Sequence, residues 1–442
     1  MFGMTTMRRK TQSGCRLLWL GIFSSMPLSA FLATSARGQV GLADLMTQES
    51  IDKAHTEQAE SSQYTYKNGD FRMLLTPALS VQWNDNIYAT ETDRQSDFII
   101  LPTLGILMTY PLTDRNLLQI SVTGGYSEYV DHHQLSSWYL STGSGINFDF
   151  YIKDILFNVH DQVSYVQSSS QNLNPQVADT GSYGTFENTA GLSGDWSLKH
   201  VDFKLGYDHQ NTLATTAEFE QTDNSAETGY AQAGYKWNSK LTTGLEGTVA
   251  YTAYNQDILN DNTSYSAGAY ATWNPDVAVQ TSLRGGYALM QFYNTSQELQ
   301  TSDLGSYYVD LNITHQITTT IVYSIDVGHN IGAGLQTDAS EYSYANASIN
   351  WKFIRNFDLV PNFSFQHGID GSGSTPLGPT NPNLLSGEEI YDFYNTGIGL
   401  NYNITKRFSV GCNYQFVVRT SSLPNRGYTQ NIIGIQLTYN PI

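Results

Sequence analysis

Residues 201–210 read "VDFKLGYDHQ", and the fold of the whole chain can be argued outward from this stretch. Val201, Phe203, Leu205 and Tyr207 alternate with polar residues or glycine. Alternation of period two is typical of a β-strand with one apolar and one polar face. The class of protein then depends on whether the apolar face meets a protein core or lipid.

The composition excludes several classes of protein. The chain has 442 residues, of which 40% are hydrophobic and only 14% are charged, and it holds 30 Tyr and 37 Gly. Soluble globular proteins carry about 25% charged residues. After the N-terminal region no apolar run reaches the length of about 18 residues that a membrane-spanning helix needs. These numbers favour an all-β protein rich in uncharged polar side chains.

Residues 1–38 have the three-part pattern of a secretory signal peptide. Basic residues come first, the apolar stretch "LLWLGIFSSMPLSAFLA" (17–33) follows, and small residues end the pattern near Gly38, where we expect cleavage. Cleavage removes five Lys and Arg residues and no acid, so the mature net charge is 17 − 40 = −23. So acidic a protein is not expected to bind nucleic acid. Cys15 leaves with the peptide, and Cys412 then has no disulfide partner.

Residues 39–70 form a polar segment that we expect on the periplasmic side, and residues 71–442 have the pattern of one antiparallel meander. Eight short connections are expected at 113–116, 152–154, 198–200, 238–240, 274–276, 318–320, 353–356 and 405–407. Nine longer loops lie near 87–96, 131–135, 168–182, 212–224, 256–261, 294–302, 333–339, 369–389 and 420–427. Strict alternation of short turns and long loops around about eighteen strands is typical of an up-and-down transmembrane β-barrel.

Aromatic residues recur on the apolar faces just before the short connections. Seven of the eight positions are aromatic and the eighth is His315. The seven are Tyr110, Phe150, Trp196, Trp237, Trp273, Trp351 and Tyr402. Trp and Tyr gather where one end of the ring meets lipid and the other meets water. The pattern therefore predicts an aromatic girdle at a bilayer surface, with lipid against the apolar face.

The opposite faces of the strands are expected to line a lumen. A sheet in lipid must close on itself because no edge can stay unpaired there, and eighteen strands leave an aqueous channel. The alternation places these residues inward: Asp149, His160, Asp202, Lys204, Asp208, Lys236, Glu246, Arg284, Asp310 and Asp326.

Charge is unevenly distributed between the two ends of the expected barrel. Lys and Arg gather near the short turns, whereas Asp and Glu gather in the loops. An acidic mouth favours a cation-preferring pore, or carboxylates that hold divalent ions against lipopolysaccharide. The loops could equally be acidic only for solubility. The longest loop, 369–389, is a candidate constriction, although a surface loop is the commoner case for a loop of this composition.

Motifs for catalysis, cofactors or metals are not found. The chain has no GxSxG, no HExxH and no phosphate-binding glycine loop. The "DHHQ" stretch at 131–134 falls in a loop, where we expect solvated histidines. The sequence therefore predicts a protein that is not an enzyme and that needs neither cofactor nor metal.

The stretch at 71–129 resembles the type-2 β-barrel porin family. The resemblance rests on Asn84-Asp85-Asn86-Ile87-Tyr88, on Ser96-Asp97, on Pro102 and on the closing "NIIGIQLTYNPI". It implies an outer-membrane barrel, of a group in which some members are associated with exopolysaccharide export, and it carries no catalytic residues. The end of the chain departs from the Phe or Trp that usually closes such barrels, which bears on assembly efficiency.

Two hypotheses follow. In the first, the protein is a porin-like channel of the outer membrane of a Gram-negative-type bacterium, cation-preferring, that passes small solutes or assists exopolysaccharide export. In the second, it is a non-conducting barrel that anchors a cell-envelope assembly. The expected partners are outer-membrane lipid, lipopolysaccharide, the barrel-assembly machinery and polysaccharide. The sequence leaves open the solute, the oligomeric state and whether loop 369–389 or residues 39–70 block the pore.

Overall fold

The computed structural model describes residues 64–113, 115–167, 173–178, 183–377, 384–385 and 387–440. The expected signal peptide at 1–38 and most of segment 39–70 lie outside these residues. Among the described residues, no helix is both long and apolar enough to cross a membrane.

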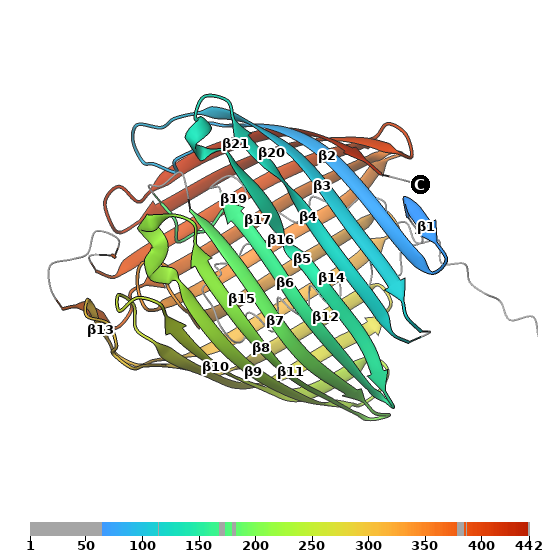
Figure 1. Ribbon diagram of the computed structural model, residues 1–442, viewed down its shortest axis with the longest axis horizontal. Coiled ribbons are helices and arrows are strands. Elements are labelled where there is room, and N and C mark those ends of the chain that lie inside the picture. Colours follow the sequence, from blue (N-terminus) through green and yellow to red (C-terminus); the bar gives the residue numbers. More distant parts are fainter. Residues whose placement is uncertain are drawn as a thin grey trace, which may run out of the picture.

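Eighteen long antiparallel strands form one closed wall (Figure 1). They are β2 (Phe71–Asn84), β3 (Asp97–Pro111), β4 (Leu117–Tyr129), β5 (Ser137–Ile152), β6 (Ile155–Gln167), β7 (Gly184–Ser197), β8 (Val201–Ala214), β9 (Asn224–Lys236), β10 (Leu241–Tyr254), β11 (Asn262–Asp276), β12 (Val279–Phe292), β14 (Leu304–Thr318), β15 (Ile321–Gly332), β16 (Ser340–Ile354), β17 (Phe357–Asp370), β19 (Glu389–Asn403), β20 (Phe408–Ser421) and β21 (Tyr428–Tyr439). Each strand pairs with its neighbour in the chain, and β2 pairs with β21. The predicted all-β, up-and-down barrel is therefore confirmed.

Shorter elements sit at the ends of the barrel. They are β1 (Tyr66–Asn68), β13 (Leu299–Thr301), β18 (Ser374–Pro376) and the 3-10 helices η2 (His133–Leu135) and η3 (Ala217–Thr222). Short turns gather at one end, on the right of Figure 1, and the long loops gather at the other.

The structure places one turn later in the chain than the sequence pattern predicts. The pattern predicts a turn at 274–276, but β11 continues through Asp276 and the connection is 277–278. The Asp276 carboxylate accepts the backbone N–H groups of Ala278 and Val279 at 2.8 and 3.1 Å. Because this side chain caps the turn from the strand end, the chain reverses after Asp276 and not before it.

The outer face of the wall is apolar and the inner face is polar, which is the arrangement that a membrane requires. On β8, Leu205 is 68% exposed, whereas Asp208 is only 5% exposed because it lies on the inner face. Large apolar side chains are exposed on the outside of strands all around the ring. An apolar exterior around a polar interior is the inverse of a soluble protein. The protein is thus a transmembrane barrel of the bacterial outer-membrane type, and the apolar face of 201–210 meets lipid.

Tyrosine rings line part of the inner wall and lie flat against it. A Cβ atom at Gly206 would come within 2.2 Å of the Tyr230 ring, and one at Gly328 within 2.6 Å of the Tyr344 ring. Each glycine therefore leaves the space into which a cross-strand ring settles. The rings cover the sheet without projecting far into the lumen.

The closing seam between β2 and β21 is shorter than the other contacts. It pairs only seven residues of β2, Ala78 to Asn84, with β21, whereas β2 pairs thirteen residues with β3. Nearer the turn end, β1 pairs with the start of β2, between Phe71 and Met73. A short hairpin from the N-terminal segment thus covers part of the β2 edge that β21 does not reach.

Candidate functional site

The segment 173–178, in the loop between β6 and β7, reaches across the inside of the barrel at its loop end. Residues 174–178 are all buried, and their contacts lie on β17, β20 and β21. Five strands stand between β6 and β20 in the ring. A segment that leaves the wall at β6 and contacts β20 must therefore cross part of the lumen.

Hydrogen bonds hold the backbone of this segment to the opposite wall. Arg419 on β20 donates through Nε to the Pro175 carbonyl at 2.7 Å. Arg426 donates through Nη2 to the Gln176 carbonyl at 3.0 Å. The Gln176 amide in turn donates to Asp370 at 3.1 Å. Charged donors make hydrogen bonds that are roughly twice as strong as neutral ones.

Both arginines are held by one carboxylate. Glu389 accepts from Arg419 at 2.8 Å and from Arg426 at 2.9 Å, and its side chain is 0% exposed. Ser421 donates a further bond to Glu389 at 2.6 Å, and the Arg419 guanidinium lies 4.7 Å from the centre of the Tyr391 ring. We call Glu389, Arg419 and Arg426 the anchor cluster. Removing one partner from so buried a group of charges leaves the others uncompensated.

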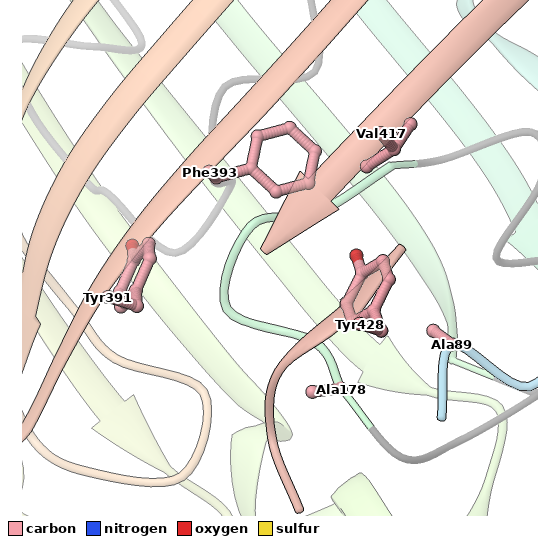
Figure 2. Packing of buried hydrophobic residues seen from close by; sticks show 6 residues of the cluster. All are labelled: Ala89, Ala178, Tyr391, Phe393, Val417 and Tyr428. Atoms are coloured by element: carbon pink, nitrogen blue, oxygen red, sulfur yellow. The ribbon is translucent and has the colours of Figure 1, made fainter. Parts of the chain in front are cut away.

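Apolar contacts hold the same segment. In Figure 2, Ala178 lies in a cluster with side chains of strands β19, β20 and β21. The cluster comprises Ala89, Ala178, Tyr391, Phe393, Val417 and Tyr428. On the other side, Val177 packs with Tyr183, Phe219 and Leu335. The segment is therefore fixed by packing as well as by charge.

The loop that the sequence suggested as a constriction is fastened elsewhere. In loop 369–389, strand β18 pairs with β13 of the neighbouring loop 293–303. Leu384 packs with Leu259 and Leu299. The described part of this loop thus joins an assembly of loops at the rim. Among the described residues, the segment that reaches across the inside of the barrel is 173–178, which the sequence did not single out, and its partners include Asp370 at the start of loop 369–389.

All ten predicted lumen residues lie on strand positions of the inner face. Five of them are buried: His160, Asp208, Glu246, Arg284 and Asp310. The other five are partly buried: Asp149, Asp202, Lys204, Lys236 and Asp326.

The structure brings several of them together in pairs. Lys236 lies 2.5 Å from Asp202, Arg284 lies 3.1 Å from Glu246, and His160 lies 3.2 Å from Asp208. Tyrosine hydroxyls add further bonds, from Tyr308 to Glu246 and from Tyr344 to Asp310. Asp149 accepts from Asn158 at 2.7 Å. Charges inside the wall are therefore mostly compensated, with carboxylates in excess.

The rest of the inner wall has a different chemistry. On β17, β19, β20, β21 and β2 it carries buried amide side chains, which we call the amide arc: Gln366, Asn395, Gln415, Gln430 and Gln82. The wall from β5 to β15, which we call the charged side, carries the predicted lumen charges, whereas the wall from β17 to β2 combines the amide arc with the buried charges of Asp358, Asp370, Glu389 and Arg419.

The predicted girdle residues lie at the turn end of the outer face. Tyr110, Trp196, Trp237, Trp273 and Trp351 are exposed there. Phe150 stacks on Phe148 and Phe157, and Tyr402 stacks on Phe357. All seven keep an apolar ring at the end of the barrel where the short turns lie.

The histidines of the "DHHQ" loop are not both solvated. His132 lies 2.9 Å from Asp97 and is 19% exposed, and only His133 is largely exposed. Asp97 also accepts backbone N–H groups of 131 and 132, so this histidine helps to fix the loop. Among the described residues, no three His, Cys, Asp or Glu side chains gather into a group that would hold a metal ion.

Comparisons with known proteins concern the fold. No family model and no curated protein match the chain. Among solved structures, it is similar to Pseudomonas aeruginosa OccK2 (OpdF) in complex with glucuronate, at 9% identity, TM-score 0.47, covering 84% of this chain and 99% of the other. Acinetobacter baumannii OccAB3 is 9% identical with a TM-score of 0.46, covering 84% of this chain and 99% of the other. Pseudomonas aeruginosa OpdK is 10% identical with a TM-score of 0.44, covering 83% of this chain and 98% of the other. The closed ring and apolar exterior of this chain, independently of these likenesses, show an eighteen-stranded transmembrane β-barrel.

Proposed function

We propose that the protein is a porin-like, cation-preferring channel of the outer membrane whose lumen is narrowed by segment 173–178. The observation that carries this proposal is the closed ring of eighteen strands with a polar inner face. A ring of this size is too wide for its own side chains to fill, so water occupies what the loops leave free. Diffusion of small polar solutes through that water is the activity that we infer.

The cation preference is supported by the inner wall. Of the ten lumen residues, six are carboxylates and three are Lys or Arg, and the three bases lie on the charged side of the lumen. Low-dielectric walls concentrate the field of such an excess and raise the local concentration of cations.

Assistance to exopolysaccharide export is the finer part of the proposal, and the amide arc supports it. Each Asn or Gln offers both a donor and an acceptor. Hydroxyl groups of a sugar also donate and accept, so an amide-rich wall matches a neutral polyhydroxylated chain better than it matches an ion.

The alternative function, a non-conducting barrel that anchors an envelope assembly, is favoured by one observation. The anchor cluster is almost fully buried and holds the crossing segment to the wall, which is the arrangement of a closed state. The two functions differ in whether an ion can pass that segment.

Conductance in a planar bilayer under a salt gradient tests the proposal. Refolded residues 39–442 are expected to conduct steadily, with a reversal potential on the cation-selective side. Heat-modifiable migration in gels shows separately that the barrel has folded. A folded barrel that stays silent would refute the open channel and favour the anchoring function.

A further inference from the structure

The outer face of the barrel carries histidine–carboxylate pairs near its loop end. His209 lies 2.9 Å from Glu227 between β8 and β9, and His329 lies 3.1 Å from Glu341 between β15 and β16. His367 lies 2.8 Å from Asp392 between β17 and β19. A fourth pair, His133 with Glu128, joins η2 to the end of β4 at 3.1 Å.

These side chains face outward and not into the lumen. On β8, His209 shares its face with Leu205 and Tyr207, which are among the most exposed apolar residues. On β17 and β19, His367 and Asp392 are 45% and 39% exposed, whereas the inner-face Gln366 is buried. The strand alternation therefore places titratable groups where the rest of the face presents apolar side chains to lipid.

The three pairs between strands lie at a common level. His209 is eight residues after the start of β8 at Val201, and His329 is eight after Ile321. His367 is ten after Phe357. At ~3.3 Å per residue and a strand tilt of about 40°, they lie roughly 20–25 Å above the turn side. The apolar band of such barrels is about 25 Å tall, so the pairs stand at the border of the outer leaflet.

Contacts within the protein give these pairs little stabilisation, which directs attention to what surrounds the barrel. Three of the pairs are well exposed, and exposed ion pairs contribute little to stability. The pair of His329 and Glu341 is only 12% and 25% exposed, and Ser343 and Ser306 also bond to it. The pairs are also spread around the ring, from β4 to β8 and β9 and to β15 through β19, so no single neighbouring copy of the chain would cover them. The surroundings common to all four positions are the headgroups of the outer leaflet.

We infer that this rim binds phosphate-bearing lipid headgroups of the outer leaflet through its histidine–carboxylate pairs. Protonated imidazole donates to phosphate oxygens. When the histidines are neutral, the carboxylates and phosphates share a divalent cation, because oxygen ligands of this kind suit Mg²⁺. Binding therefore has two modes that pH selects.

Charged and titratable neighbours are few at each position. The Tyr207 hydroxyl bonds to Glu227 beside His209, and the Tyr307 ring stacks on His329 at 4.2 Å. Within the described strands we find no Lys or Arg on the outer face at this level. Histidine is therefore the source of positive charge at these positions when it is protonated.

The test is binding of diphosphorylated lipid A to the detergent-solubilised full barrel, counted by native mass spectrometry. In EDTA, wild type is expected to bind at least about tenfold more tightly at about pH 5.5 than at about pH 8, since each basic group at an anionic surface contributes roughly fivefold. Adding Mg²⁺ is expected to restore binding at the higher pH. Dephosphorylated lipid A should not show either effect.

The triple variant H209Q/H329Q/H367Q is expected to lose the pH dependence. The matched control is His315→Gln, because this histidine also faces outward but lies at the turn end; it should behave as wild type. Equal binding by wild type and triple variant, or equal binding of the dephosphorylated lipid, would overturn the inference. A change of oligomeric state in the triple variant would also overturn it, in favour of a protein partner. None of these results depends on whether the barrel conducts.

Discussion

Truncating Arg419 to alanine should loosen the segment that crosses the lumen. The change removes the bond from Arg419 to the Pro175 carbonyl and one of the two arginines that face Glu389. A hydrogen bond from a charged group contributes about 1.5–3 kcal/mol. The bond from Arg426 to Gln176 and the apolar contacts remain. Docking should therefore weaken by about that amount, which corresponds to a shift of roughly 10- to 150-fold toward the undocked segment.

Single-channel recording measures this shift directly. We expect R419A to show high-conductance events more often than wild type by about that factor, while the smaller conductance level persists between them. Arg115→Ala, in a short turn at the far end of the barrel, is the matched control and should behave as wild type. The reasoning is refuted if folded R419A has the same event frequency and the same conductance levels as wild type.

Three further predictions concern the wall and the loops. Glu246→Gln leaves Arg284 without its ion pair, so the reversal potential under a salt gradient should move toward anions. Gly206→Ala forces the Tyr230 ring off the wall, and a crowded site of this kind should lower the free energy of unfolding by about 1–3 kcal/mol, measured by urea titration in detergent. Burial raises the pKa of Asp338, so the loop assembly should be most stable below about pH 4, the value for an unfolded aspartate. Hydrogen-exchange protection of loop 255–261 should then fall as pH rises through the raised pKa.

Each of these predictions has a control or a contradicting result. Glu298→Gln changes the same charge in a rim loop and should move the reversal potential less. Gly229→Ala meets only an ordinary contact at 3.7 Å and should leave the stability nearly unchanged. Protection of loop 255–261 that increases with pH would contradict the role given to Asp338.

The barrel could be predicted from the sequence because its signals are local. Each strand repeats the alternation of 201–210, so eighteen strands give eighteen independent observations of one pattern. Each short turn can likewise be recognised from a few consecutive residues. The same alternation sorts side chains such as Glu246 to the inner face. Where a side chain overrides the local pattern, as Asp276 does, the turn is displaced.

The crossing segment could not be predicted because it depends on distant residues. Pro175 and Arg419 are 244 positions apart, and the residues around each of them form no pattern from which their contact could be predicted. The pairs on the outer rim were hidden for the same reason. His367 and Asp392 are each unremarkable in their own strands, and only the register between β17 and β19 places them together.

The short seam between β2 and β21 is the contact that closes the ring. These strands are the first and the last of the wall, so the ring cannot close until β21 is in place. Closure then joins the two ends of the wall through seven residue pairs, fewer than any other pair of neighbouring long strands has. The seam is therefore the contact between neighbouring long strands that has the least pairing to resist separation, and the β1 hairpin adds three residue pairs to β2 beyond its turn-side end.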